Sequence, residues 1–232
     1  MIKPKFILTD IEGTTTPKTF VYDVLFPYFI QNIEKIQFRK HLKPYAEGLQ
    51  LTKNAILEES KTQISVSLDF ILDTLKIWVK NDRKHPGLKL LQGLIWEDGY
   101  NSGELKGIIY DDVLVQLENW FENGIALGVY SSGSIRAQKL LFSHTNQGNI
   151  CAFFQSFFDT TIGGKKEASS YAKISIDVGV NPNEILFLSD MEDELEPAKQ
   201  SGMSTIQLVR DQSTKPSTKH MICTNFSEIK WK

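Results

Sequence analysis

The strongest constraint on the fold is an alternation of two patterns that begins near residue 106. Segments with the apolar spacing of amphipathic helices cover residues 110–123, 134–143, 167–178 and 192–201. Between and after them lie short apolar runs typical of buried strands, at residues 125–130, 157–158, 185–188 and 205–209. A further apolar run, Phe6-Ile7-Leu8, opens the chain. Strands that alternate with helices at this spacing predict a Rossmann-like, doubly wound α/β fold with a parallel sheet.

The segment from about residue 18 to residue 105 departs from this alternation. Helical patterns occupy residues 21–36, 66–79 and 88–96, and the polar stretch at 50–65 fits a loop or a short helix. Because little in this segment is typical of a strand, we expect a separate helical cap domain at residues 18–105. The Rossmann-like catalytic core would then consist of residues 1–17 and 106–232.

Composition and charge exclude several classes of partner. The 232 residues carry a formal net charge of −2, and their basic residues form no long stripe, so neither nucleic acid nor an anionic membrane is an expected partner. No apolar run approaches the ~20 residues that a membrane span needs. The two cysteines, Cys151 and Cys223, form no metal-spaced pair, and no signal sequence is evident, so we expect a cytoplasmic protein. Without a long heptad pattern, we expect a monomer.

Acidic, hydroxyl-bearing or basic residues follow four of the predicted strands. In an open parallel sheet, ligands bind at the carboxyl ends of the strands. The four segments found there are Asp10-Ile11-Glu12-Gly13-Thr14-Thr15, Ser131-Ser132-Gly133-Ser134, the stretch from Thr160 to Lys165, and Ser189-Asp190. Together they supply carboxylates, hydroxyls and a cation, which are the groups that phosphoryl transfer through a covalent intermediate requires.

These residue types suggest individual roles. Asp10 would attack phosphorus, and Lys165 would balance the charge of nucleophile and phosphate. Glu12 would donate a proton to the leaving oxygen and later activate water. Mg²⁺ prefers oxygen ligands, which Asp10, Asp190 and the backbone carbonyl of Glu12 can provide. The Ser131 hydroxyl and the N–H groups at the start of the helix at 134–143 would hold the phosphate oxygens.

Each of these residues also has a simpler structural interpretation. An acid after a strand is most often a helix cap or a solvated turn, which applies to Asp10 and Asp190. The serines at 131–134 could be an ordinary N-cap cluster, and Lys165 could be a solvated loop lysine. The acids Glu192, Asp193, Glu194 and Glu196 are expected to form a solvated face at a helix start. The order of all four segments on successive strands nevertheless favours the functional interpretation.

The same segments resemble a known superfamily and one family within it. The four motifs of haloacid dehalogenase-type phosphatases are matched by Asp10–Thr15, Tyr130–Ser134, Gly164–Glu167 and Leu188–Asp190, with Glu12 where most members have Asp. The closer resemblance is to the enolase-phosphatase (acireductone synthase) family of methionine salvage. It rests on Asp10–Pro17, Leu25–Tyr28, Leu91–Gly93 with Trp96, and Tyr130–Ser134 followed by Ala137–Phe142.

The resemblance implies an activity and a set of site residues. The implied enzyme uses one Mg²⁺ per chain to enolise 2,3-diketo-5-methylthiopentyl-1-phosphate and then dephosphorylates it to the acireductone. By position, Asp10, Glu12 and Asp190 fall on the family's metal-binding positions, and its substrate-binding positions are matched by Ser131, Ser132 and Lys165. The family often has Arg-Pro-Gly after the last strand, where this chain has Arg210-Asp211-Gln212, so the role of that loop is open.

Two alternatives remain at this point. A phosphatase of the same superfamily could act on another small phosphomonoester without enolisation. A protein on the same scaffold could instead bind a phosphometabolite without catalysis, although the presence of the nucleophile, both acids and the lysine argues against this. Glu12 is the first candidate for the group that takes the carbon-bound proton during enolisation.

Overall fold

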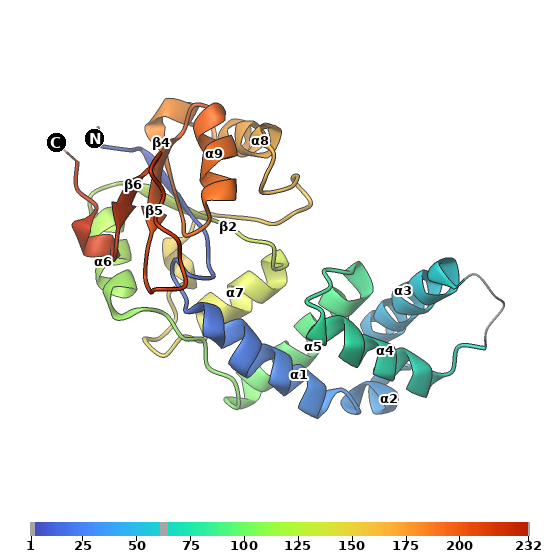
Figure 1. The fold of residues 1–232 in the computed structure, drawn as a ribbon. Helices are drawn as coiled ribbons and strands as arrows, with labels where there is room; N and C mark the ends of the chain where they lie inside the picture. Colours follow the sequence, from blue (N-terminus) through green and yellow to red (C-terminus); the bar gives the residue numbers. More distant parts are fainter. Residues whose placement is uncertain (1–2, 61–64, 232) are drawn as a thin grey trace. The chain divides into compact units, whose positions relative to one another are not determined.

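A computed structural model describes residues 3–60 and 65–231, and a parallel sheet forms the core of residues 1–20 and 106–232 (Figure 1). Within the described residues the sheet has six strands in the order β3-β2-β1-β4-β5-β6, and all neighbouring strands run parallel. The strands are β1 (Phe6–Thr9), β2 (Ala126–Tyr130), β3 (Ser156–Phe158), β4 (Ile185–Ser189), β5 (Ser204–Leu208) and β6 (Met221–Cys223). The predicted Rossmann-like α/β fold is therefore confirmed.

Strand β1 lies at the point where the strand order reverses. In the strand register, Thr9 of β1 pairs with Val129 of β2 on one side and with Leu188 of β4 on the other. All four β1 residues are buried, which explains why the strand is a continuous apolar run rather than an alternating one. The carboxyl ends of β1, β2 and β4 consequently meet at a topological switch point, where ligands of such sheets bind.

Four helices connect the strands after β1. They are α6 (Asp111–Glu122), α7 (Ile135–Ser143), α8 (Ala168–Val178) and α9 (Glu192–Gln200), and they match the predicted segments within two residues. Helices α8 and α9 pack on one face of the sheet around a buried cluster that includes Phe6, Tyr171, Phe187 and Leu195. Since crossovers are right-handed and their direction reverses after β3, α6 and α7 cover the opposite face.

The sequence did not predict strand β6. It lies beyond the polar stretch at residues 211–219 and pairs with β5, where Leu208 is level with Cys223. Two of its three residues are exposed, so it lacks the apolar run that marks a buried strand. The strand expected last, at 205–209, corresponds to β5 and is therefore not the edge strand of the sheet, because β6 lies beyond it.

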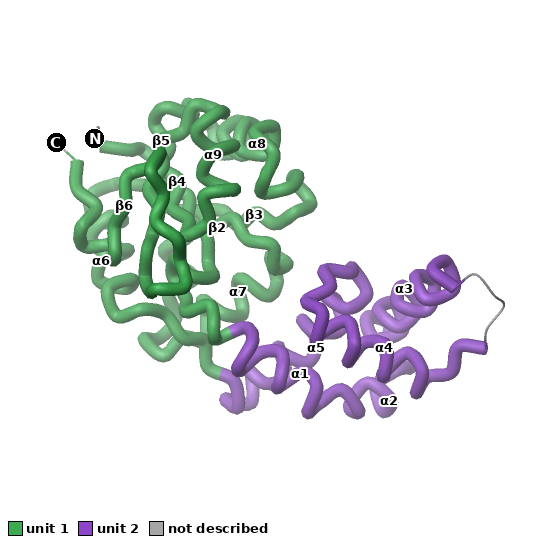
Figure 2. Tube along the Cα trace, viewed as in Figure 1, with its two compact units in different colours: residues 1–20, 106–232 green, residues 21–105 purple. Residues whose placement is uncertain are grey.

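The chain divides into two compact units, which Figure 2 colours separately. Unit 1 comprises residues 1–20 and 106–232, and unit 2 comprises residues 21–105. The described elements of unit 2 are all helical. The α-helices are α1 (Phe26–Asn32), α2 (Lys35–Arg39), α3 (Lys43–Glu59), α4 (Leu68–Lys80) and α5 (Pro86–Ser102). A π-helical turn (Phe20–Leu25) precedes α1. Across the described part of both units, no helix is long and apolar enough to cross a membrane.

Two predictions inside unit 2 were wrong in detail. The helix expected at 21–36 is divided into the π-helical turn, α1 and part of α2. Pro27, which lacks an N–H group, lies in the first turn of α1, where a proline is tolerated. Residues 50–59, expected as a loop or a short helix, complete the long helix α3. Residues 61–64 of the same expected loop lie outside the described residues.

Candidate active site

Strand pairing brings three predicted site residues to one edge of the sheet. Asp10 follows β1 and its N–H donates to Leu188 O at 2.8 Å, which continues the ladder one step past the strand. Asp190 follows β4, and Ser131 follows β2 with its N–H donating to Phe158 O at 3.1 Å. All three side chains are buried, so their polar groups depend on protein partners or on a ligand.

Residues 10–16, here called the nucleophile loop, are shaped by their own backbone. Ile11 O accepts the N–H groups of Thr14, Thr15 and Thr16 at 2.9 to 3.1 Å, and Gly13 N–H donates to Thr16 O at 2.7 Å. Gly13 has a φ of +72°, and a Cβ added there would lie 2.7 Å from Asp190 Cγ. Only glycine therefore permits both the turn and the close approach of the loop to Asp190.

Lys165 is held between two carboxylates. Its Nζ lies 2.7 Å from Asp10 Oδ1 and 2.6 Å from Glu194 Oε2, and its side chain is only 6% exposed. Tyr171 fixes the backbone here, because its hydroxyl donates to Lys165 O at 2.7 Å. Burial alone would lower the pKa of Lys165, but the charges of Asp10 and Glu194 outweigh burial and raise it. Lys165 is therefore a permanent cation beside the expected nucleophile, not the solvated loop lysine of the simpler interpretation.

Glu194 corrects one sequence-based expectation. It was expected on a solvated acidic face, yet its side chain is only 13% exposed and accepts a hydrogen bond from Ser189 Oγ at 3.0 Å. Burial, followed by the charge of Asp10, raises the pKa of Glu194 to about 7, although Lys165 and Ser189 act in the opposite direction. A usable signal did exist: Glu194 is the third residue of α9 and lies four residues after Asp190, so it stays close to the end of β4.

The residues expected to bind phosphate lie at the end of β2 and the start of α7. Ser131 and Ser132 follow β2 as expected; Ser131 is buried and its Oγ accepts Gly133 N–H at 3.2 Å, while Ser132 is half-buried. The first turn of α7, however, uses its N–H groups within the protein. Ile135 N–H donates to Asp159 Oδ2 and Ala137 N–H to Ser134 Oγ, each at 3.3 Å. Asp159, which was not predicted from the sequence, thus occupies an N–H group at the start of this helix.

Asp190 shows that a cation fits this edge of the sheet. Its Oδ2 is buried and lies 2.5 Å from the Lys18 ammonium, which balances its charge. Burial and the charge of Asp10 raise the pKa of Asp190, whereas Lys18 lowers it. Lys18, which the sequence analysis did not identify, thus stands where a positive charge is required.

The donor set suits a hard divalent ion that keeps several waters. Asp10 and Asp190 offer carboxylate oxygens on adjacent strands. Glu12 is half-buried in the nucleophile loop, and no cluster of three acidic, histidine or cysteine side chains with metal-binding geometry occurs in residues 3–60 and 65–231. The two carboxylates and the Glu12 backbone carbonyl, completed by water, are the groups that could hold Mg²⁺ here.

Comparison with known proteins gives a consistent picture, although no family model matches the chain. Enolase-phosphatase E1 of Marinobacter nauticus is 45% identical over 226 residues, which are 97% of this chain and 96% of the relative. The UTR4 protein of Saccharomyces cerevisiae superposes with a TM-score of 0.78 at 30% identity, covering 98% of this chain and 100% of the other. The HAD-hydrolase YfnB of Bacillus subtilis, solved with magnesium bound, shares the fold at 13% identity, with a TM-score of 0.60 over 97% of this chain and 96% of YfnB.

Proposed function

The chain belongs to the enolase-phosphatase family, and from this membership we propose that it acts on 2,3-diketo-5-methylthiopentyl-1-phosphate in methionine salvage. The products would be the acireductone 1,2-dihydroxy-3-keto-5-methylthiopentene and phosphate. The observation that carries the proposal is the position of Lys165 Nζ, 2.7 Å from Asp10 Oδ1, at the carboxyl end of the sheet, where Asp190 follows β4. A buried carboxylate with a fixed cation suits attack on a phosphate ester.

The two units would have different roles. Unit 1, which contains the site residues, is proposed as the catalytic core, and unit 2 as a cap that selects the substrate. The protein would work as a cytoplasmic monomer with one Mg²⁺ per chain. This assignment keeps all of the proposed phosphoryl chemistry on unit 1.

Asp10 would act as the nucleophile of the phosphatase step. One of its carboxylate oxygens forms a bond to phosphorus while the bond from phosphorus to the substrate oxygen breaks. Glu12 gives its proton to the departing oxygen and then takes a proton from water, which attacks phosphorus and releases phosphate from Asp10. Lys165 holds the Asp10 carboxylate in place and balances the negative charge that builds up around phosphorus.

The remaining site residues would bind the substrate and the metal. Ser131, Ser132 and Lys165 would bind the phosphate oxygens. Asp10, Asp190 and the carbonyl of Glu12 would hold Mg²⁺, which supplies charge neutralisation of the phosphate and polarisation of a neighbouring carbonyl. During enolisation, Glu12 would take the proton from carbon, and its half-buried position two residues after Asp10 is compatible with that role.

The test follows two signals with the purified protein and the diketone phosphate. An enol-like absorbance change and phosphate release should both occur with Mg²⁺, and both should stop when a chelator is added. The rival function, a phosphatase without enolisation, predicts phosphate release with no absorbance transient. If neither signal appears with Mg²⁺ present, the proposed function is wrong.

A further inference from the structure

Arg210 ties the nucleophile loop to other parts of unit 1, and we infer that it positions this loop for catalysis. The residue follows β5, and its side chain is only 4% exposed. Its Nε and Nη2 groups both donate to the backbone oxygen of Thr14, at 3.1 and 2.8 Å. Two N–H groups of one guanidinium thus converge on a single carbonyl of the loop that begins with Asp10.

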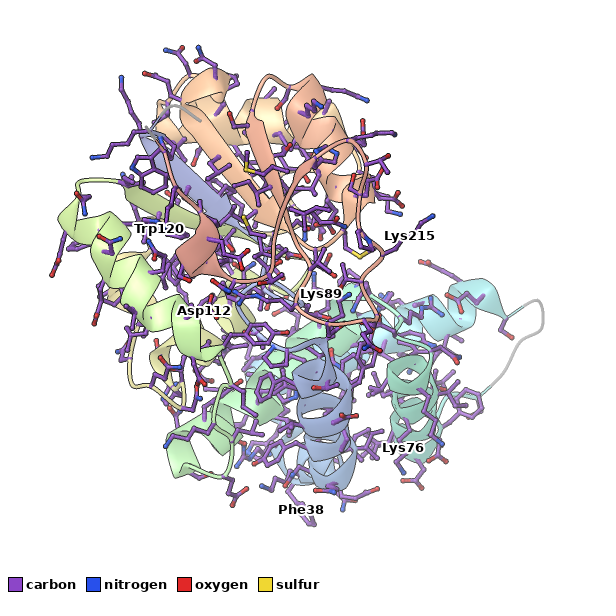
Figure 3. All side chains as sticks on the ribbon, turned by 60° about the vertical axis from the view of Figure 1, so that its left-hand side comes forward. Phe38, Lys76, Lys89, Asp112, Trp120 and Lys215 are labelled. Atoms are coloured by element: carbon purple, nitrogen blue, oxygen red, sulfur yellow. The ribbon has the colours of Figure 1, made fainter. Side chains whose placement is uncertain are left out.

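The guanidinium is itself fixed on its other sides. Nη1 pairs with Asp112 Oδ1 at 2.7 Å, and the second oxygen of Asp112 accepts Phe226 N–H at 2.7 Å. Cζ lies 4.4 Å from the ring centroid of Tyr110 and 4.9 Å from that of Phe226. Figure 3 labels Asp112 on α6, the helix that also carries Trp120. A buried ion pair and two aromatic contacts therefore fix the Arg210 guanidinium, which in turn binds the nucleophile loop.

A second contact acts on the neighbouring peptide. Tyr110 N–H donates to Thr15 O at 3.0 Å, so consecutive carbonyls of the loop are bound by residues outside it. The hydrogen bonds to Ile11 O set the internal shape of the loop. The bonds from Arg210 and Tyr110 set its orientation relative to the sheet, and hence where the Asp10 carboxylate lies with respect to Lys165.

Arginine suits this position for a geometric reason. Its planar group donates in two directions at once, to Thr14 O and to Asp112, whereas a lysine ammonium is a compact point charge on a flexible stem. Arg210 contacts backbone and side chains but none of the groups proposed to bind substrate, so it is a positioning residue. This inference rests on the proposed function, because the loop that it orients carries the proposed nucleophile.

The test compares Arg210→Lys and Arg210→Met with Val113→Ala. Val113 is fully buried on α6 next to Asp112, and its truncation destabilises unit 1 without removing a hydrogen bond to the nucleophile loop. For each variant, kcat and KM of phosphate release are measured at a temperature where the melting curve shows full folding. The Kd for Mg²⁺ is measured by calorimetric titration of the metal-free protein.

Arg210→Met should lower kcat about 10- to 100-fold with less than about a threefold change in KM, because a misplaced nucleophile slows chemistry more than binding. It should also raise the Kd for Mg²⁺, and Arg210→Lys should recover part of both effects. Val113→Ala should lower only the melting temperature. The inference is overturned if Arg210→Met behaves like Val113→Ala, with unchanged kcat and Kd. If the methionine variant does not fold, the lysine variant decides by the same criteria.

Failure of the proposed function can be separated from failure of this inference. If the wild-type protein releases no phosphate from the diketone phosphate, the proposed substrate is wrong. The Kd for Mg²⁺ still decides whether Arg210 orients the nucleophile loop, because that measurement needs no substrate. An equal Kd in wild type and Arg210→Met would then overturn the inference.

Discussion

Replacing Glu194 by glutamine tests the charge balance around Lys165. Two buried carboxylates share one ammonium, since Lys165 Nζ lies 2.7 Å from Asp10 and 2.6 Å from Glu194. Burial and the charge of Asp10 raise the pKa of Glu194 from its ordinary 4.5 to about 7. Between these pH values the folded, metal-free protein holds a proton that the unfolded chain has released.

The sign of the stability change follows from this proton. The free energy of unfolding falls with rising pH wherever the folded state binds more protons, so Glu194 lowers stability as the pH rises from 4.5 to about 7. At about 1.4 kcal/mol per pH unit, the full loss above pH 7 is on the order of 3 kcal/mol. Glu194→Gln has no such proton to lose. It should match the wild type near pH 5 and exceed its stability by up to about 3 kcal/mol at pH 8.

The assay is urea unfolding at pH 5 and pH 8 with a chelator present, because a bound cation would change the local pKa values. The same variant should turn over more slowly with Mg²⁺, since Lys165 loses one of the two groups that hold it. Asp193→Asn is the matched control, because Asp193 lies on the same helix but pairs with exposed Lys166, and no comparable pH-dependent gain is expected. A Glu194→Gln variant that is less stable than the wild type at pH 8 would refute the reasoning.

Two further predictions concern the cation position at Asp190. Gly13→Ala should cost about 1–2 kcal/mol from its positive φ, and it should also weaken Mg²⁺ binding in calorimetric titration, because the new methyl group would lie 2.7 Å from Asp190 Cγ. Gly124→Ala has the same kind of φ with open space around it, so it should cost stability without affecting Mg²⁺; equal Mg²⁺ affinity in both variants would contradict the account. Lys18→Met should lower the melting temperature of the metal-free protein and enlarge the rise caused by Mg²⁺, because the ammonium no longer occupies the charge position at Asp190. An unchanged rise would mean that Lys18 and the metal do not share that position.

The sequence was sufficient to predict the core of the fold because its signals are local. Strands such as Phe6–Thr9 and Ile185–Ser189 are continuous apolar runs, and helices with regular apolar spacing separate the later strands. Parallel strands with right-handed crossovers leave few possible topologies. The same logic placed Asp10 and Asp190 at the carboxyl ends of two strands, and the structure shows that these strands are neighbours.

The features that the sequence missed depend on contacts between distant residues. Glu194 resembles any acid at a helix start until Lys165 is placed beside it. Lys18 and Arg210 are long side chains whose direction is set by Asp190 and by Asp112, each about 100 or more residues away. Composition and periodicity carry no information on such pairings. The catalytic, substrate-binding and metal-binding roles of all the predicted site residues stay predictions.

The most direct test of the central claim is detection of a phosphoryl group on Asp10. Wild-type protein is mixed with the diketone phosphate and Mg²⁺, quenched in acid during turnover, digested, and analysed by mass spectrometry. We predict that the peptide containing Asp10 gains the mass of one phosphoryl group, and that Asp10→Asn shows neither this gain nor phosphate release. Full phosphate release by Asp10→Asn, or a phosphoryl group on a different residue, would contradict the account.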